Sequence, residues 1–263
     1  MKELEHIRKT INTYDEEIIE TLSLRFEAVK KVAQIKKENS IPIFDRKREE
    51  EIIKSIQLRE MVHVSEIAEI YKEIMKESRK YQSKMLLPKK LFLTGFMGAG
   101  KSTTGKLLSE ITGFKFTDTD LIIEEMTQMK VPDIFRKKGE KHFRQLETEV
   151  LNKISKETYE IIACGGGIIL KEENRKKLKN NGKTIFLNGS IEVMMERIQD
   201  DSNRPLTIPL HNINPQKKHE AFKDILKKRM PFYLESADFI IDIDNKKPEE
   251  IADEILTMLI TES

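Results

Sequence analysis

The residues with the clearest chemical signature form a glycine-rich segment near the middle of the chain. Gly95 begins the sequence Gly-Phe-Met-Gly-Ala-Gly-Lys-Ser-Thr, which ends at Thr103 and contains the pattern G-x4-G-K-[ST]. In such a loop, backbone N–H groups surround a β-phosphate and the positive end of the following helix adds to the attraction. Lys101 would reach the β- and γ-phosphates, and Ser102 would offer its hydroxyl to Mg²⁺. The segment therefore predicts a nucleotide site made by Gly98, Ala99, Gly100, Lys101, Ser102 and Thr103.

Two carboxylates follow the next aliphatic run. The segment 114–120 reads Phe-Lys-Phe-Thr-Asp-Thr-Asp and contains Asp118 and Asp120. Carboxylates two residues apart in an extended chain point to opposite faces, so one could face a metal ion and the other a phosphate acceptor. Alternatively, Asp120 opens a helical pattern and caps that helix, which is the interpretation that these residues alone favour.

Charged and small residues recur after later elements. Arg144 and Glu147 lie one helical turn apart, which by itself is an ordinary ion pair. Three glycines, 165–167, follow a strand-like aliphatic run, and glycines at the carboxyl end of a strand let a ligand approach the backbone. The polar, aperiodic stretch 203–214, which contains Arg204, is typical of a lid.

The elements that must position these residues divide the chain in two. All 11 glycines lie at or beyond Gly95, so the preceding 94 residues predict long helices with few connections. Beyond Gly95, short aliphatic runs alternate with amphipathic stretches, as in a parallel α/β domain. Pro88 cannot continue the last helical pattern. We therefore expect an N-terminal all-α domain of three helices, 1–87, and a C-terminal α/β domain, 88–263.

In the predicted helices, some positions at the spacing of the apolar stripe are occupied by polar residues. In the first helix, about residues 4–37, Arg25 and Lys36 lie eleven residues apart, about three turns, and share the stripe face. In the third helix, which begins near Ser65, the stripe continues through Ser78 and Gln82. Each of these could be a snorkelling side chain or part of an internal ion pair. Because unpartnered buried cations are unfavourable, the whole set predicts a small dianionic ligand.

Residues 1–86 resemble the all-α chorismate mutase family. The polar positions of that family's pocket are filled, at the family's spacing, by Arg8, Arg25, Lys36, Asp45, Arg48, Glu49, Ser78 and Gln82. The resemblance implies a homodimer of three-helix protomers in which the long first helices cross. Arg8, one residue off the main stripe, would then reach into the partner's pocket.

The resemblance also implies a role for each of these residues. Arg8 and Arg25 would clamp the two carboxylates of chorismate, with support from Arg48. Lys36 and Gln82 would hydrogen-bond the ether oxygen. The hydroxyl of chorismate would be read by Asp45, Glu49 and Ser78. A Claisen rearrangement needs no nucleophile and no obligatory proton transfer, so cations and amides suffice to hold the reactive chair and to stabilise charge on the ether oxygen.

Residues 90–263 resemble shikimate kinase. The specific marks, in the family's order, are GFMGAGKS, DTD, FRxxE, GGG, RPL and RxPxY. The resemblance implies a P-loop kinase with a parallel five-stranded sheet flanked by helices, as in nucleoside monophosphate kinases. It also implies ATP as co-substrate and Mg²⁺ as cofactor.

The acceptor of this kinase would be shikimate. The resemblance assigns Asp118 to the Mg²⁺ shell and Asp120 to the shikimate hydroxyls, including the attacking 3-hydroxyl. Arg144 and Arg229 would take the carboxylate, and Glu147 would orient Arg144. The acceptor pocket would be lined by Gly165, Gly166 and Gly167.

The nucleotide side of the resemblance is less complete. Arg204 would stabilise transferring charge from the lid, and Arg197 and Lys246 would flank adenine. The segment 245–248 carries lysines where an arginine often stacks, and lysine stacks less well. The lid also departs from the family's pattern, so its contacts beyond Arg204 stay open.

Composition bounds the remaining possibilities. The formal net charge is +2; residues 1–86 carry 18 Lys+Arg against 17 Asp+Glu, which leaves 29 against 28 for the rest. Neither part has a field that would attract nucleic acid or an anionic membrane. Cys164 is the single cysteine, which excludes a disulfide within the chain. With no signal-like or membrane-spanning apolar run, we expect a cytoplasmic protein.

Two alternatives stand beside a bifunctional enzyme. A kinase for another polyol acid, such as gluconate, would keep the phosphate loop but not the FRxxE, GGG and RxPxY marks. Residues 1–86 could instead be a non-catalytic dimerisation module that senses chorismate or prephenate. Arg8, Lys36 and Gln82 argue against lost catalysis.

Overall fold

The computed structural model describes residues 1–154, 158–198 and 215–262 of the 263. It contains two compact units. The first comprises Met1–Leu87 with the chain end from Ile260, and the second comprises Pro88–Leu259.

The first unit consists of three helices, α1 (Lys2–Glu38), α2 (Arg46–Gln57) and α3 (Val64–Leu86). Helix α3 contacts both of the others, and Ala33, Ile56, Ala68 and Met75 are buried between them. Helix α2 begins where the Asp45 side chain caps its first turn by accepting a hydrogen bond from the backbone of Arg48. The prediction of an all-α three-helix domain is therefore confirmed.

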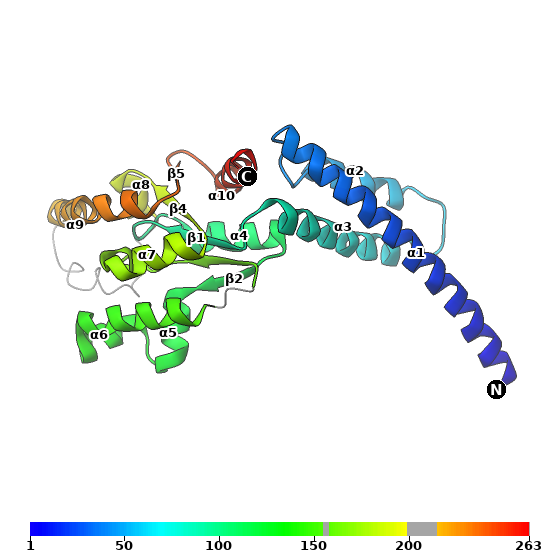
Figure 1. Cartoon of the computed structure of the whole chain (residues 1–263), viewed down its shortest axis with the longest axis horizontal. Coiled ribbons are helices and arrows are strands. Elements are labelled where there is room, and N and C mark those ends of the chain that lie inside the picture. The colour runs from blue at the N-terminus through cyan, green and yellow to red at the C-terminus, as the bar shows by residue number, and fades with distance from the viewer. Residues whose placement is uncertain (155–157, 199–214, 263) are drawn as a thin grey trace. The chain divides into compact units, whose positions relative to one another are not determined.

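The N-terminal half of α1 is not covered by the other helices of its unit. Figure 1 shows this half extending beyond α2 and α3. Its apolar stripe is about half exposed, with Leu4, Ile7, Ile11, Tyr14 and Ile18 at 50–59%.

The second unit is built on a five-stranded sheet in the order β2-β3-β1-β4-β5, in which every neighbouring pair is parallel. The strands are β1 (Lys90–Thr94), β2 (Lys115–Asp118), β3 (Glu160–Ala163), β4 (Lys183–Asn188) and β5 (Phe239–Asp242). Aliphatic and aromatic residues fill the central strands, which are buried on both faces. The predicted parallel five-stranded sheet is confirmed.

Parallel strands require crossover connections, and helices supply them. The helices after β1 and β2 are α4 (Lys101–Thr112), α5 (Thr119–Thr127) and α6 (Val131–Lys153). Those after β3 are the 3₁₀ turn η1 (Ile168–Leu170), α7 (Glu172–Asn181), α8 (Ile191–Glu196), α9 (Pro215–Ser236) and, after β5, α10 (Pro248–Thr261).

The helices cover both faces of the sheet. Helix α4 packs closely on the face of Leu93, because a Cβ on Gly105 would lie 3.3 Å from Leu93 and 2.5 Å from the Phe116 ring. On the opposite face, Phe92 and Lys177 of α7 line a second cavity of about 260 Å³. Successive residues of a strand point to opposite faces, so the alternation along β1 separates the two helical layers.

A buried ion pair joins β1 and β3 where both strands begin. Lys90 and Glu160 are register partners, and the Lys90 ammonium lies 2.8 Å from Glu160 Oε2 and donates to Thr158 at 2.7 Å. Thr117 of β2 donates to the other carboxylate oxygen. Burial alone would raise the pKa of Glu160, but the hydrogen bonds from Lys90 and Thr117 hold it below its usual value.

Among the helices of the described ranges, none is long and apolar enough to cross a membrane.

Candidate active sites

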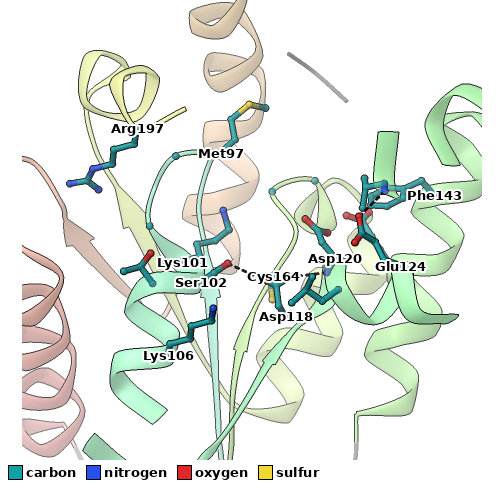
Figure 2. Close-up of a pocket in the computed structure, with 18 of the residues that line it drawn as sticks. Met97, Lys101, Ser102, Lys106, Asp118, Asp120, Glu124, Phe143, Cys164 and Arg197 are labelled. Carbon is teal, nitrogen blue, oxygen red and sulfur yellow. Dashed lines mark hydrogen bonds between the residues drawn. The ribbon is translucent and has the colours of Figure 1, made fainter. Parts of the chain in front are cut away.

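The carboxyl ends of β1, β2 and β3 open into a cavity of about 570 Å³ (Figure 2). This is the edge of a parallel sheet at which ligands bind in open α/β folds. The predicted residues that line it are Gly98, Gly100, Lys101, Ser102, Thr103, Asp118, Asp120, Arg144, Glu147, Gly166, Gly167, Arg197 and Arg229.

The glycine-rich loop between β1 and α4 has a backbone that requires glycine. Gly98 and Gly100 have φ angles of 81° and 82°, and a Cβ on Gly98 would lie 2.2 Å from the carbonyl oxygen of Met194. Gly100 precedes the first residue of α4. The Lys101 ammonium is buried and donates to the carbonyl oxygens of Gly95 at 2.9 Å and Phe96 at 3.0 Å. The N-terminus of α4 and the Lys101 ammonium thus lie together at this loop, and both favour the binding of a polyphosphate.

Oxygen ligands lie beside this loop. Ser102 Oγ donates to Asp118 Oδ2 at 2.7 Å, and Figure 2 shows the two side chains facing each other. Hydroxyl and carboxylate oxygens are the ligand type that Mg²⁺ prefers. Asp118 Oδ1 accepts from the backbone N–H of Asp120 at 3.0 Å, so Asp118 caps α5. The interpretation of Asp120 as the cap is therefore wrong, and both carboxylates line one cavity rather than opposite faces.

The far end of the cavity is formed by Arg144 and Glu147 of α6. Arg144 Nη1 donates to Glu147 Oε2 at 2.8 Å, and Nη2 donates to Glu140 Oε1 at 2.8 Å. The guanidinium lies 5.5 Å from the centre of the Phe143 ring. Burial raises the pKa of Glu147 to about 7, although the charge and hydrogen bond of Arg144 oppose the shift. The Arg144 guanidinium therefore faces the cavity from a fixed position.

The three glycines after β3 pass between these charged groups. A Cβ on Gly165 would lie 2.4 Å from Asp120 Oδ1, and one on Gly167 would lie 2.1 Å from Arg144 Nη1. The carbonyl oxygen of Gly166 accepts from Tyr233 Oη at 2.5 Å and from Arg229 Nη1 at 3.2 Å. Tyr233 is fully buried. Side chains at Gly165 and Gly167 would therefore displace Asp120 and Arg144, two groups that line the pocket.

Some predicted residues lie elsewhere. Ala99 and Gly165 do not line the cavity, and the Lys246 ammonium pairs with Glu254 of α10 at 2.6 Å. Arg197 lines the cavity beside the phosphate loop, on the side away from Asp118 (Figure 2). Arg204 lies outside the described residues.

Sequence reasoning missed several residues of the cavity wall. Lys106 follows Ser102 by one turn of α4, and Glu124 follows Asp120 by one turn of α5, so helical spacing could have found both. Other missed wall residues are Met97, Phe116, Leu121, Val131, Phe135 and Phe143. Cys164 also borders the cavity, but burial raises the pKa of its thiol far above the usual value, which fits a structural role.

A second group of polar side chains lies within the helical unit, on α1 and α3. Arg25 of α1 donates to Ser78 Oγ of α3, and Gln82 Nε2 donates to the Ser78 carbonyl oxygen at 3.3 Å. Gln82 is buried, and its Oε1 has no hydrogen-bond partner within the described ranges. The Lys36 ammonium donates to the Ile43 carbonyl oxygen at 2.6 Å.

Two carboxylates act on Lys36. Burial lowers the pKa of Lys36, whereas the negative charges of Asp45 and Glu49 raise it. Arg48 is different, because its side chain is 66% exposed and lies 3.5 Å from Glu51. Arg8 is exposed and precedes Arg25 by 17 residues on one helix, which places it about 25 Å away along the axis. The Arg8 side chain therefore does not reach Arg25, Lys36, Ser78 or Gln82 of the same chain.

A glycine-rich phosphate loop after the first strand of a parallel sheet, with one carboxylate at the last residue of β2 and another two residues later, is typical of a P-loop kinase. The family model described as shikimate kinase matches residues 97–260, and the model described as chorismate mutase type II matches residues 7–83. The chain therefore belongs to the shikimate kinase family and carries a chorismate mutase domain ahead of the kinase. The two family matches support a bifunctional enzyme, shikimate kinase and chorismate mutase, and the kinase family uses ATP as co-substrate. A gluconate kinase is set aside by this membership.

Individual proteins that are similar to this chain are also shikimate kinases. A shikimate kinase of Thermodesulfovibrio yellowstonii is 44% identical over 168 residues, which are 64% of this chain and 93% of the relative. One from Caldanaerobacter subterraneus subsp. tengcongensis is 40% identical over 172 residues, covering 65% and 96%. A solved shikimate kinase from Acinetobacter baumannii in complex with shikimate is 34% identical, with a TM-score of 0.64 over 70% of this chain and 98% of that chain.

Proposed function

We propose that the domain 88–263 transfers the γ-phosphoryl group of ATP to the 3-hydroxyl of shikimate, and that the domain 1–87 rearranges chorismate to prephenate. The observation that carries the kinase assignment is the cavity itself. A phosphate loop at one end faces the Arg144–Glu147 pair at the other, with Asp120 between. This arrangement fits an acceptor with a hydroxyl directed at the nucleotide and a carboxylate directed away from it.

The phosphate end would hold the nucleotide and its metal. The loop N–H groups and Lys101 would hold the β- and γ-phosphates. Ser102 and Asp118, already joined at 2.7 Å, would hold Mg²⁺, which would neutralise charge on the phosphates. Arg197 would lie near the base, and Arg204 would stabilise transferring charge from the lid. A part for Lys246 would require its pair with Glu254 to open.

The acceptor end would hold shikimate by charge and by shape. Asp120 would accept the hydrogen bond of the attacking 3-hydroxyl and so orient its oxygen towards the γ-phosphate. Arg144 and Arg229 would bind the carboxylate, since charge-assisted hydrogen bonds to a carboxylate are strong and directional. Gly166 and Gly167 would form the pocket wall, with Gly165 behind it. A side chain at Gly165 would collide with Asp120, and one at Gly167 would collide with Arg144.

The helical domain would bind chorismate with Arg25 and Lys36, supported by Arg48 and the hydrogen-bonding side chains of Ser78 and Gln82. Lys36 and Gln82 would stabilise the negative charge that grows on the ether oxygen. The hydroxyl of chorismate would be read by Asp45, Glu49 and Ser78.

Arg8 would come from the partner of a homodimer that pairs the exposed α1 stripes. Two observations support the dimer. The stripe on the first half of α1 is exposed, and Arg8 is about 25 Å from its own Arg25. A cytoplasmic location stays a prediction.

A pair of assays on the purified chain tests both activities: ATP-dependent phosphorylation of shikimate, and conversion of chorismate to prephenate. Arg144→Ala should lower kcat/KM for shikimate on the order of 100-fold or more, because a charged hydrogen-bond partner is lost. Chorismate turnover should stay unchanged. Arg136→Ala is the matched control, since Arg136 lies on the same helix but is 73% exposed. Shikimate kinetics within a few-fold of wild type in Arg144→Ala would place the pocket elsewhere.

The second candidate for residues 1–87 is a sensor that binds chorismate or prephenate without converting it. The buried carboxamide of Gln82, aimed at the polar set, favours catalysis. Ligand binding by the wild-type chain with no prephenate formed would favour the sensor.

A further inference from the structure

Arg79 has no role in the mutase assignments above, yet it contacts a residue that has one. It follows Ser78 on α3, and its Nη1 donates to both carboxylate oxygens of Glu49 on α2. The two side chains are 14% and 24% exposed, so this ion pair is screened less than a surface pair. The Arg79 guanidinium also lies 4.8 Å from the centre of the Phe44 ring. Glu49 is thus held by a cation that is itself fixed against an aromatic face.

The Glu49 carboxylate is one of two negative charges that act on Lys36. A carboxylate near an ammonium in a partly buried site tends to form a direct ion pair with it. In the described structure Lys36 instead donates to the Ile43 carbonyl oxygen at 2.6 Å, and Glu49 faces Arg79. An ion pair between Glu49 and Lys36 would occupy the ammonium that the reaction needs.

The charge of Glu49 has a second effect. Chorismate is a dianion, and an uncompensated carboxylate in its pocket would repel it. A guanidinium bound to both oxygens cancels most of that charge while leaving Glu49 able to accept a hydrogen bond from a hydroxyl.

We propose that Arg79 is a positioning residue of the mutase reaction, which holds and neutralises Glu49 so that Lys36 stays available to the ether oxygen. The inference rests on the proposed chorismate mutase function of residues 1–87. It predicts that the harm done by losing Arg79 comes from Glu49, and that removing the charge of Glu49 relieves it.

The test uses the full chain and four variants: Arg79→Met, Glu49→Gln, the double variant of both, and Arg46→Met. Arg46 is the matched control because it is also an arginine beside Phe44, at 5.0 Å, but it is exposed and has no bond to Glu49 in the described structure. Steady-state kcat and KM are measured for chorismate. Shikimate phosphorylation and circular dichroism verify that each variant is folded.

Arg79→Met should lower kcat/KM for chorismate at least tenfold. The loss should lie mainly in kcat, because Glu49 would still form an ion pair with Lys36 when chorismate is bound. Arg46→Met should change it less than twofold. The double variant should be no worse than Glu49→Gln alone, which is a rescue that a purely structural role would not give. A double variant whose loss equals the product of the two single losses would overturn the inference, as would an unaffected Arg79→Met.

A second substitution covers a failure to fold. Arg79→Lys keeps the positive charge but not the planar guanidinium that binds both carboxylate oxygens. It should lower mutase activity by a few-fold. Adding Glu49→Gln to this variant should relieve the loss in the same way. Failure of the proposed function is recognised separately, because the wild-type chain would then convert no chorismate at all.

Discussion

Glu147 accepts a hydrogen bond from Arg144 at 2.8 Å through Oε2, while its equally buried Oε1 has no hydrogen-bond partner in the described part of the chain. The carboxyl group is therefore only half satisfied by the protein. Burial raises its pKa to about 7, against the opposing effect of Arg144, and Asp120 adds to the rise. We therefore expect the free energy of unfolding of the kinase domain to depend on pH up to about neutrality.

Glu147→Gln should change how the free energy of unfolding depends on pH. Because the folded pKa lies above the ordinary 4.5, the folded state binds the proton more tightly. Below pH 4.5 the wild-type group is protonated in both states. As pH rises from 4.5 to 7 the wild type should lose up to about 3 kcal/mol relative to the variant, with no further change above 7. Urea unfolding of both proteins across this range measures it.

Glu140→Gln is the control for this experiment, since Glu140 bonds the same arginine but its side chain is 59% exposed. This substitution leaves the buried carboxyl group of Glu147 in place, so the pH-dependent loss of stability assigned to Glu147 should persist in Glu140→Gln. A flat difference for Glu147→Gln would mean that the folded pKa of Glu147 is the same as its unfolded pKa, and so would contradict the raised pKa.

Gly167→Ala should weaken shikimate binding while keeping the fold. The new Cβ would lie 2.1 Å from Arg144 Nη1 and would push the guanidinium away from its bonds with Glu147 and Glu140, without displacing backbone. We expect KM for shikimate to rise on the order of tenfold, KM for ATP to change little, and the melting temperature to shift by only a few degrees. Equal rises of both KM values would show a general distortion of the domain instead.

Gln82→Glu should make the mutase require acid. The amide donates a hydrogen bond at any pH, but a carboxyl group donates only when it is protonated. The optimum for chorismate turnover should therefore move to lower pH, and the kinase profile should not. Gln57→Glu, at an exposed position on α2, is the control. An unchanged mutase profile would remove Gln82 from the ether oxygen.

Ile11→Glu should separate the proposed homodimer into single chains. Ile11 lies in the exposed α1 stripe at 50% exposure, and a charge there would oppose burial against a second copy. Light scattering should give a monomer, mutase activity should fall at least tenfold because Arg8 of the partner is lost, and kinase activity should persist. Leu58→Glu, at a position 74% exposed and outside α1, should remain dimeric. A monomeric wild-type chain that still rearranges chorismate would exclude a shared site.

The sequence predicts those elements whose conformation depends on residues close together in the chain. The phosphate loop was predictable because its glycines adopt positive φ angles that the spacing of the motif encodes. The three helices of residues 1–87 were predictable because glycine is absent there and the apolar stripe persists. The parallel sheet followed from the alternation of short aliphatic runs and amphipathic stretches.

Contacts between distant segments were not predictable in the same way. Glu49 and Arg79 are separated by 30 residues, and Gly166 and Tyr233 by 67, so only the packed fold brings each pair together. The cap of α5 was misassigned by two residues, because Asp118 reaches the N–H of Asp120 from the last position of β2. Lys106 and Glu124 were missed although their helical spacing indicates them.

The Lys90–Glu160 pair lies where β1 and β3 begin, whereas the phosphate loop and the three glycines follow the opposite ends of the same strands. A slip of one residue between these strands would bury a charge without its partner, which is strongly destabilising. It would also move the glycine segment about 3.3 Å relative to the phosphate loop. The ion pair therefore stabilises the register of β1 and β3 that places the phosphate loop beside the three glycines.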